Sequence, residues 1–275
     1  MMGRLIIFSD LDGTLLDQKR GYSFEEALPA LEAIKDGGIP LCLCSSKTKD
    51  EMELIRARMG NGDPFVVENG GAIFIPGGYF DFPFDYSRKE EDYLVIELGT
   101  PYEVLRRVLK EIEEEAGCQL RGYGDMSAEE VAERTGLTLE EARLSKKRGY
   151  DEPFLMVEDE AEQRAVLEMF EGKGLRWTKG NQFYHITGDN DKGKAAEILK
   201  GLYRKKFGEM TTIGIGDSLN DLPLLKVVDI PIIVQGPDGY YAKELKLPKL
   251  IWAEGIGPRG FNSAVLNLLG GLDKL

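Results

Sequence analysis

Asp10 and Asp12 stand two residues apart in an Asp-Leu-Asp-Gly-Thr segment, directly after the short apolar run 5–8. This arrangement suits phosphoryl transfer, because one carboxylate can attack phosphorus while the other gives and takes a proton. Gly13 allows a sharp turn and a close approach of the backbone to a ligand. Either aspartate alone could instead be a turn or helix-cap residue, so further residues are needed to support this chemistry.

Three further segments carry polar residues behind predicted strands or at the start of a predicted helix. Because the carboxyl ends of parallel strands meet at one edge of a sheet, these residues can converge on one crevice. Each alone could be a loop, cap or surface residue, but four such segments in this order argue against coincidence. The residues are Ser45 and Ser46 after 39–44, Lys192 in 191–194, and Asp217, Asn220 and Asp221 after 212–215.

The residue types suit phosphate chemistry with a bound cation. Aspartate oxygens without a cluster of cysteine or histidine favour a hard cation, and Mg²⁺ is the natural partner of phosphate. Such an ion would offset the repulsion between carboxylates and phosphate. The hydroxyl of Ser45 and the ammonium of Lys192 can hold the phosphoryl oxygens as charge shifts in the transition state.

These residues require a sheet whose strand ends lie side by side. Predicted strands and helices alternate along 4–67, and one helix opens with a capping box at Thr48 and Glu51. The alternation predicts an α/β fold with a doubly wound, Rossmann-like parallel sheet and right-handed crossovers. It returns near the C-terminal end, with helices at 191–207, 219–226 and 258–269 and strands at 211–215, 230–234 and 250–252.

The pattern changes after about residue 75. Segments 72–75 and 79–82 flank a Pro-Gly-Gly turn and predict a hairpin. Residues 84–188 form a self-contained series of strands and helices, so we expect an inserted α+β cap domain there and a catalytic core at 1–83 and 189–275. The predicted elements of the insert are strands at 93–98, 118–121, 154–157, 175–178 and 183–187 and helices at 102–116 and 160–172.

The net charge of the chain argues against some classes of binding partner. The net charge of −13 opposes nonspecific binding to nucleic acid or to an anionic membrane, so a small molecule is the expected partner. An anionic substrate then needs a local cationic pocket or a bound metal ion. No apolar stretch approaches membrane-spanning length, and the N-terminal apolar run predicts a core strand and not a secretory signal.

The cysteines and the histidine offer little chemistry. Cys42, Cys44 and Cys118 form an odd set without framework spacing, which indicates reduced thiols and a cytoplasmic location. The first two have no second cluster to complete a metal site. His185 is the only histidine, so mechanisms that need two are excluded, and we expect it to be structural or peripheral.

Two short predicted helices in the insert begin with capping boxes at Ser127 and Thr138. A DNA-reading helix-turn-helix is an alternative for this pair, but its acidic first turns would repel phosphates. The basic residues at 146–148 are typical of a solvated helix end. Together with Arg143 they could instead form the cationic patch that an acidic substrate requires.

The four motifs around Asp10, Ser45, Lys192 and Asp217 resemble those of the haloacid dehalogenase-like phosphohydrolases. The large insert between the second and third motifs resembles the cap of their Cof-type branch. Segments 121–132, 135–137 and 141–143, together with 68–72, resemble the mannosyl-3-phosphoglycerate phosphatases. The likeness covers essentially the whole chain.

The resemblance implies a role for each matching residue. Asp10 would be the nucleophile and Asp12 the acid/base, while Ser45 and Lys192 would bind phosphate. Magnesium would be held by Asp10, the Asp12 carbonyl and Asp217, with Asp221 supporting that shell. In the cap, Arg143, Lys146, Arg148 and Lys179 are candidates for the substrate carboxylate. Asn69 and Gly70 would meet the sugar-glycerate moiety, and Ser46 and Asn220 are further candidates for substrate contact.

We therefore expect a Mg²⁺-dependent phosphatase that converts mannosyl-3-phosphoglycerate into mannosylglycerate and phosphate through an aspartyl-phosphate. The cap would close over the site, exclude bulk water and select the substrate. One alternative keeps the chemistry but changes the substrate to glucosyl-3-phosphoglycerate, another sugar phosphate or a sugar mutase reaction. Another is a noncatalytic phosphoryl acceptor that resembles a receiver domain, although receivers are shorter and lack such an insert. The oligomeric state is left open.

Overall fold

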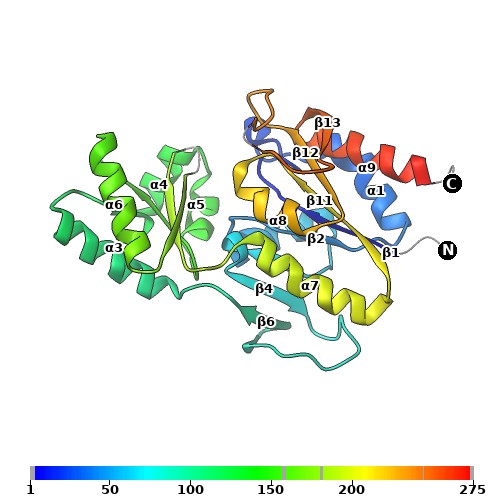
Figure 1. The fold of residues 1–275 in the computed structure, drawn as a ribbon, viewed down its shortest axis with the longest axis horizontal. Helices are drawn as coiled ribbons and strands as arrows, with labels where there is room; N and C mark the ends of the chain where they lie inside the picture. Colours follow the sequence, from blue (N-terminus) through cyan, green and yellow to red (C-terminus); the bar gives the residue numbers. More distant parts are fainter. Residues whose placement is uncertain (1–3, 157–158, 180–181, 244, 273–275) are drawn as a thin grey trace.

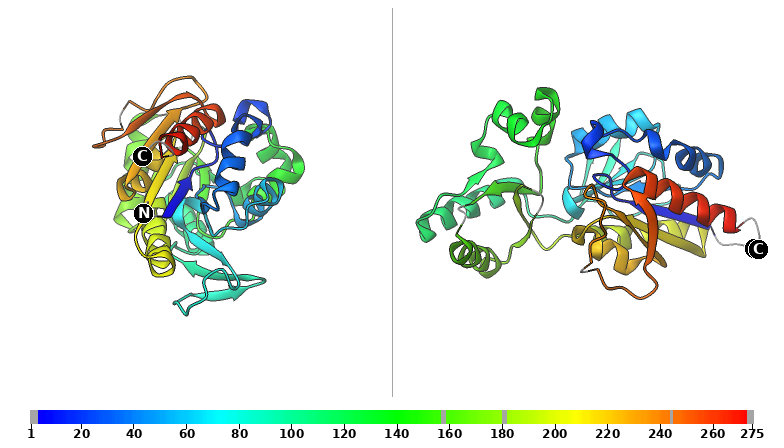
Figure 2. Two further views of the ribbon diagram at one scale, coloured as in Figure 1. Left: turned by 90° about the vertical axis from the view of Figure 1, so that its right-hand side faces the viewer. Right: turned by 90° about the horizontal axis from the view of Figure 1, so that it is seen from above.

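The computed structural model describes residues 4–156, 159–179, 182–243 and 245–272. It contains two lobes that lie side by side, as Figure 2 shows. We call the lobe formed by residues 102–187 the cap lobe and the other described residues the core lobe. Both ends of the described chain lie in the core lobe, on the side away from the cap lobe (Figure 1).

The centre of the core lobe is a parallel sheet with the strand order β13-β12-β11-β1-β2. The crossover helices cover both of its faces, so the predicted doubly wound α/β class is confirmed (Figure 1). The strands are β1 (Arg4–Ser9), β2 (Leu41–Leu43), β11 (Met210–Gly216), β12 (Ile230–Gln235) and β13 (Ile251–Ile256). The helices are α1 (Leu28–Asp36), α2 (Lys49–Met59), α7 (Lys192–Phe207), α8 (Leu222–Val227) and α9 (Pro258–Leu272).

Alternate residues of β1 enter the two layers of the core. Ile7 is buried in the layer that includes Ala30 of α1 and Phe261 of α9. Phe8 is buried in the opposite layer, which includes Tyr203 of α7 and Leu224 of α8. Because successive side chains of a strand point to opposite faces, an apolar run without alternation suits a strand that is covered on both sides.

A second, antiparallel sheet with the order β3-β4-β6-β5 adjoins the parallel one. A parallel bridge between Cys44 and Val66 joins the two sheets. The strands are β3 (Phe65–Val67), β4 (Ala72–Pro76), β5 (Arg88–Glu90) and β6 (Tyr93–Glu97). The strand β6, which the sequence analysis placed in the inserted domain, therefore pairs with β4 of the core lobe, and β5 follows at the edge.

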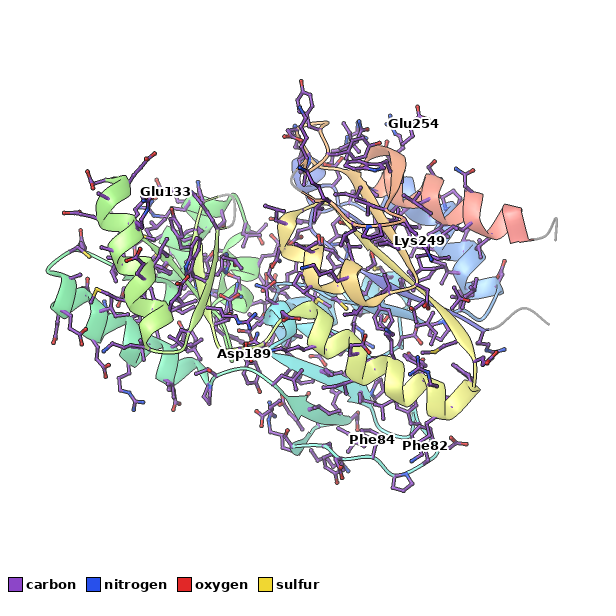
Figure 3. The ribbon with its side chains drawn as sticks, in the orientation of Figure 1. Phe82, Phe84, Glu133, Asp189, Lys249 and Glu254 are labelled. Carbon is purple, nitrogen blue, oxygen red and sulfur yellow. The ribbon has the colours of Figure 1, made fainter. Side chains whose placement is uncertain are left out.

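The predicted hairpin between 72–75 and 79–82 is wrong. The strand β4 pairs with β3 on one side and β6 on the other, so no edge is free for 79–82. Aromatic residues of this segment favour a strand by propensity, yet Phe80 packs its ring 5.3 Å from that of Tyr203 on α7. Phe82 and Phe84 lie along the same stretch, near the lower edge of Figure 3.

The cap lobe is built on an antiparallel sheet with the order β7-β8-β10-β9. Helices α3 and α6 share one buried cluster with this sheet. The strands are β7 (Arg121–Gly122), β8 (Glu152–Leu155), β9 (Arg176–Lys179) and β10 (Tyr184–Thr187). The helices are α3 (Tyr102–Ala116), α4 (Ala128–Thr135), α5 (Leu139–Ser145) and α6 (Glu160–Gly172). Val157, the predicted end of β8, lies outside the described residues.

Several local predictions are confirmed. The capping boxes at Thr48, Ser127 and Thr138 open α2, α4 and α5. The helices α3 and α6 have the predicted bounds. Among the described residues, the helices are too short or too polar to cross a bilayer.

Candidate active site

Four chain segments deliver polar residues to the carboxyl edge of the parallel sheet. Asp10 follows β1, Ser45 comes two residues after β2, and Asp217 follows β11. Lys192 is the first residue of α7, whose N-cap is Asp191. Because β1 lies between β2 and β11 in the sheet, the three strand ends are direct neighbours.

Lys192 joins two of the carboxylates. Its Nζ donates to Asp10 Oδ1 at 2.6 Å and to Asp221 Oδ1 at 2.7 Å. The Lys192 side chain is 1 % exposed and that of Asp221 is fully buried. Burial by itself lowers the pKa of Lys192, but the two carboxylates outweigh it and raise the net pKa above its ordinary value. Lys192 is therefore a permanent positive charge at the base of the site.

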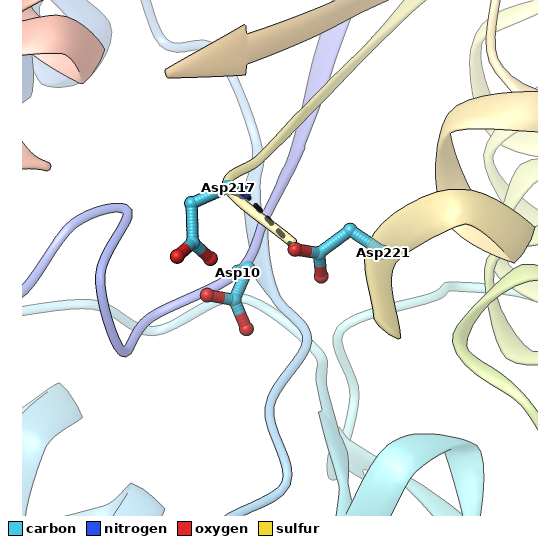
Figure 4. Close-up of side chains that lie close together, drawn as sticks. All are labelled: Asp10, Asp217 and Asp221. Atoms are coloured by element: carbon cyan, nitrogen blue, oxygen red, sulfur yellow. Dashed lines mark hydrogen bonds between the residues drawn. The ribbon is translucent and has the colours of Figure 1, made fainter. Parts of the chain in front are cut away.

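Asp10, Asp217 and Asp221 form a compact acidic group. One carboxylate oxygen from each lies within 4.8 Å of the others, and Figure 4 shows Asp10 and Asp217 directed toward the same space. Asp221 is anchored by its Oδ2, which accepts the backbone N–H groups of Asp217 and Ser218 at 3.1 and 3.2 Å. Asp10 Oδ1 accepts from Lys192, and Asp217 Oδ1 accepts from the Thr14 hydroxyl at 3.4 Å. Among the described residues, Asp10 Oδ2 and Asp217 Oδ2 are therefore the oxygens best placed to bind a ligand.

Two carboxylates of the acidic group have raised pKa values. Burial raises the pKa of Asp10 to about 7, although Lys192 opposes this effect. Burial and the neighbouring carboxylates of Asp10 and Asp221 raise the pKa of Asp217 to about 8. Clustered carboxylates with raised pKa values are the donor set that a hard divalent cation would stabilise in the ionised form. The chemistry of the group therefore fits a metal ion.

Two glycines make the close approach of these segments possible. Gly13 has a φ of +87°, and a Cβ there would lie 2.5 Å from Asp217 Oδ2. A Cβ on Gly216 would lie 2.5 Å from the Asp221 side chain. The sequence analysis assigned Gly13 a close approach to a ligand. The structure shows that it lets the loop after β1 lie against Asp217, in the loop after β11.

Asp12 pairs with a lysine that sequence reasoning missed. Lys47 Nζ lies 3.0 Å from Asp12 Oδ2. The other oxygen of Asp12, Oδ1, is buried and has no hydrogen-bond partner among the described residues. Burial lowers the pKa of Lys47, but Asp12 and Glu51 outweigh it and raise the net value. The only signal in the sequence was its place two residues after Ser45.

The two serines after β2 have different surroundings. Ser45 is fully buried, and its hydroxyl accepts the backbone N–H of Lys47 at 3.2 Å. Its own N–H is bonded to Val66 O, which fixes the loop beside β3. Ser46 offers its backbone carbonyl to Arg148 of the cap lobe at 2.8 Å. Ser45 is thus positioned within the core lobe, whereas Ser46 lies at the contact between the lobes.

The segment Glu68–Gly70 has a left-handed backbone conformation and contacts both lobes. Asn69 has a φ of +57° and Gly70 a φ of +88°. The Asn69 amide donates to Asp151 Oδ2 of the cap lobe at 3.0 Å, and its oxygen accepts from Asn220 at 2.8 Å. A Cβ at Gly70 would lie 2.2 Å from Asp191 O. The Asn69 side chain and Asn220 therefore hold one another, and Gly70 allows a close backbone contact.

Of the four cap cations predicted to bind the substrate carboxylate, two are held by hydrogen bonds and two are exposed. Arg148 is buried and reaches the core lobe, with Nη1 on Ser46 O and Nε on Ser145 O at 2.9 Å. Lys146 donates to the carbonyls of Tyr123 and Met126 within the cap lobe. Arg143 and Lys179 are exposed, and in the described ranges neither forms a hydrogen bond or ion pair with the core lobe.

Two further acidic residues at this contact were also missed. Glu68 accepts the backbone N–H groups of Gly149 and Tyr150 at 2.8 Å. Burial raises its pKa to about 7, although Arg148 opposes the shift. Asp151 is fully buried and lies 2.9 Å from His185 Nδ1. The structure therefore places His185 in the cap lobe as the partner of a buried carboxylate, a contact that no local pattern in the sequence indicates.

Comparisons with known proteins identify the family of the chain. A family model described as haloacid dehalogenase-like hydrolase matches residues 7–81. The glucosyl-3-phosphoglycerate/mannosyl-3-phosphoglycerate phosphatase of Methanococcoides burtonii is 48% identical over 265 residues, which cover 96% of this chain and 97% of the relative. The protein of the same name from Persephonella marina is 41% identical over 272 residues, which cover 98% and 99%.

Solved structures share the fold at low identity. A protein from Thermoplasma acidophilum aligns with a TM-score of 0.68 at 17% identity, and the alignment covers 98% of this chain and 99% of that one. A phosphatase of the haloalkanoate superfamily from Bacteroides thetaiotaomicron aligns with a TM-score of 0.66 at 18% identity, over 98% and 96%. At such identities the likeness supports the two-lobed α/β fold alone.

Proposed function

Because the chain belongs to the haloacid dehalogenase-like hydrolases, in the family of the mannosyl-3-phosphoglycerate phosphatases, we propose that it hydrolyses mannosyl-3-phosphoglycerate to mannosylglycerate and phosphate. The enzyme class is phosphoric monoester hydrolase. The observation that carries the proposal is the meeting of Asp10, Lys192 and Asp217 at one sheet edge. It supplies a nucleophile, a fixed positive charge and a cation-binding carboxylate within one site.

The first half-reaction transfers the phosphoryl group to the protein. A carboxylate oxygen of Asp10 attacks phosphorus, and the bond between phosphorus and the glycerate oxygen breaks. Asp12 gives its proton to the departing oxygen, so the sugar-glycerate leaves as an alcohol. Asp12 Oδ1 is buried and has no hydrogen-bond partner in the part of the chain that the structure describes. This supports the role, because the atom is available for such a proton transfer.

The second half-reaction returns the protein to its starting state. Asp12, now ionised, takes a proton from water while the water oxygen attacks the phosphorus of the Asp10 aspartyl-phosphate. The bond between phosphorus and the Asp10 oxygen breaks, which releases inorganic phosphate. Atoms balance over the two steps, since one water is consumed and its proton passes through Asp12.

We propose that Asp10, the backbone carbonyl of Asp12 and Asp217 hold Mg²⁺, and that Asp221 supports them by anchoring the Asp217 backbone. When bound, the ion would supply positive charge that keeps the carboxylates ionised and polarises the phosphoryl group. Lys192 and the Ser45 hydroxyl would hold the phosphoryl oxygens from the protein side.

The cap lobe bears on substrate choice. The core helix α2 contacts α5 of the cap lobe, and Thr48 Oγ1 donates to Leu144 O across this contact at 3.1 Å. We propose that this closed arrangement excludes bulk water from the aspartyl-phosphate and selects the substrate. We propose that the catalytic core and the inserted cap correspond to the two lobes, with the cap beginning near residue 101.

The names of the relatives differ in the hexose of the substrate. The names of the Methanococcoides burtonii and Persephonella marina relatives contain both glucosyl- and mannosyl-3-phosphoglycerate, whereas that of the Pyrococcus furiosus relative contains the mannosyl compound alone. We therefore propose the mannosyl compound as the main substrate and the glucosyl compound as the leading alternative.

The three cysteines are free thiols, in keeping with the expected cytoplasmic location.

A substrate panel tests the proposal. Phosphate release with Mg²⁺ is measured for mannosyl- and glucosyl-3-phosphoglycerate, free hexose phosphates and 3-phosphoglycerate. We expect the highest kcat/KM with mannosyl-3-phosphoglycerate and many turnovers per protein. A higher kcat/KM with a simple hexose phosphate would overturn the substrate. Release of no more than one phosphate per protein would favour the noncatalytic acceptor.

A further inference from the structure

Lys47 is a buried cation next to the proposed acid/base. Its side chain is 9 % exposed, and its Nζ lies 3.0 Å from Asp12 Oδ2 and 3.9 Å from Glu51 Oε1. Only the contact with Asp12 is short enough for a good hydrogen bond. An ammonium has three donors, so Lys47 can bind a further acceptor without losing Asp12.

The lysine faces the contact between the two lobes. It lines a cleft with Tyr22 and Glu51 of the core lobe and with Glu141 and Leu144 of the cap lobe. The Tyr22 ring lies 4.5 Å from the ammonium and covers one side of it. A group held in this cleft would touch the lysine and the cap lobe together, and the lysine in turn contacts Asp12.

The chemistry of the proposed substrate places its carboxylate near this lysine. In a 3-phosphoglycerate ester, three single bonds of about 1.5 Å separate the leaving oxygen from the carboxylate carbon, so the two lie within about 4 Å. The acid must approach the leaving oxygen to about 3 Å. A cation in contact with Asp12 therefore has the reach to bind the carboxylate during the reaction, and Lys47 is such a cation.

Three other buried or half-buried cations near the site are already bound to groups of the protein. Lys192 is held by Asp10 and Asp221 at the phosphate end. Arg148 is bound to two carbonyls and is close to Asp151, at 4.0 Å. Lys146 donates to two carbonyls of the cap lobe. This leaves Lys47 as the best-placed receptor for a carboxylate beside Asp12.

We infer that Lys47 is a specificity-determining residue that binds the glycerate carboxylate of the substrate. The inference rests on the proposed function, since it is the phosphoglycerate ester that brings a carboxylate next to the leaving oxygen. It replaces the four cap-lobe cations considered from the sequence with a residue of the core lobe. The ammonium selects for a negative group next to the leaving oxygen, and neutral phosphate esters lack that group.

A paired-substrate experiment tests the inference. The kcat/KM values of wild type and Lys47→Gln are measured for mannosyl-3-phosphoglycerate and for the same compound with its carboxylate converted to the neutral amide. We expect Lys47→Gln to lose roughly 50-fold with the carboxylate substrate and far less with the amide, because a charge-assisted hydrogen bond is removed in only one case. For each protein, the kcat/KM for the carboxylate substrate is divided by that for the amide. A general effect of the substitution on Asp12 lowers both values and cancels in this ratio.

Further variants serve as controls. Arg58→Gln removes an exposed cation that lines the same cleft and is expected to leave the preference for the carboxylate substrate in place. Lys47→Arg keeps the charge and should retain much of that preference. Lys47→Met is measured beside Lys47→Gln, so that the removal of charge can still be assessed if one of them does not fold.

The possible outcomes distinguish a failure of the role proposed for Lys47 from a failure of the proposed function. Equal losses with both substrates in the Lys47→Gln or Lys47→Met variant would overturn the inference, because Lys47 would then act on Asp12 or on the fold. Wild type that hydrolyses other phosphate esters but not mannosyl- or glucosyl-3-phosphoglycerate would overturn the proposed function itself. The first result comes from the variants and the second from wild type alone, so the failures are distinct.

Discussion

Lys192 and Asp10 form a buried ion pair, with 2.6 Å between Nζ and Oδ1, although 182 residues separate them in the chain. The pair joins the first residue of α7 to the loop after β1, and Asp221 completes it from the loop after β11. The whole cap lobe lies between the two partners in sequence. The site therefore exists only when the chain returns from the cap lobe, past Asp189, to the same sheet edge (Figure 3).

Lys192→Met should damage both activity and stability. It removes the charge between two buried carboxylates, and breaking a buried pair in this way costs about 3–5 kcal/mol. We expect phosphate release to fall at least about 100-fold, since a group that holds the phosphoryl oxygens is lost. Lys194→Met is the matched control, because Lys194 lies on the same helix but pairs with Asp189 at the surface. Its effect should stay within about 1 kcal/mol in thermal unfolding.

Gly13→Ala should weaken the cation site. The new Cβ would lie 2.5 Å from Asp217 Oδ2 and would displace that carboxylate. We expect the Mg²⁺ concentration that gives half-maximal activity to rise about 10-fold, as for other losses of ligand positioning. Gly21→Ala introduces a side chain at a similar positive φ with nothing within 4 Å. An equal change in Mg²⁺ requirement in both variants would show that backbone strain is the cause.

Glu68→Gln should alter the pH dependence of stability. Burial raises the pKa of Glu68 from 4.5 to about 7, so the folded protein binds more protons than the unfolded chain between these values. Stability therefore falls as pH rises through this window, by an amount on the order of 3 kcal/mol. The glutamine variant lacks this ionisation and should lose less stability from pH 4.5 to 7 in denaturant titrations. Parallel curves for the two proteins would contradict the prediction.

The parts of the fold that follow from local signals could be predicted from the sequence. The helix α3 has an amphipathic pattern and ends at Ala116, directly before Gly117, so its bounds could be predicted. The aromatic segment after β4 was not, because strand propensity cannot tell pairing with a neighbour from packing on Tyr203. That distinction depends on where α7 lies, which no window of the chain contains.

The same limit applies to the site. Asp10, Lys192 and Asp217 stand in motifs whose spacing points to their chemistry. The residues at the contact between the lobes do not: Lys146 and Arg148 are two positions apart and both basic, yet only Arg148 reaches the core lobe. Lys47 was missed for a related reason, since its partner Asp12 belongs to another loop. Such contacts come from the docking of distant segments.

The Asp10→Asn substitution tests the central claim, that Asp10 is the nucleophile, most directly. Asparagine keeps the shape of the side chain but cannot form the aspartyl-phosphate. The measurement is multiple-turnover phosphate release from mannosyl-3-phosphoglycerate with saturating Mg²⁺, on protein whose fold is verified by circular dichroism. We predict a rate at least about 1,000-fold below wild type. Full metal-dependent activity in the variant would contradict the account.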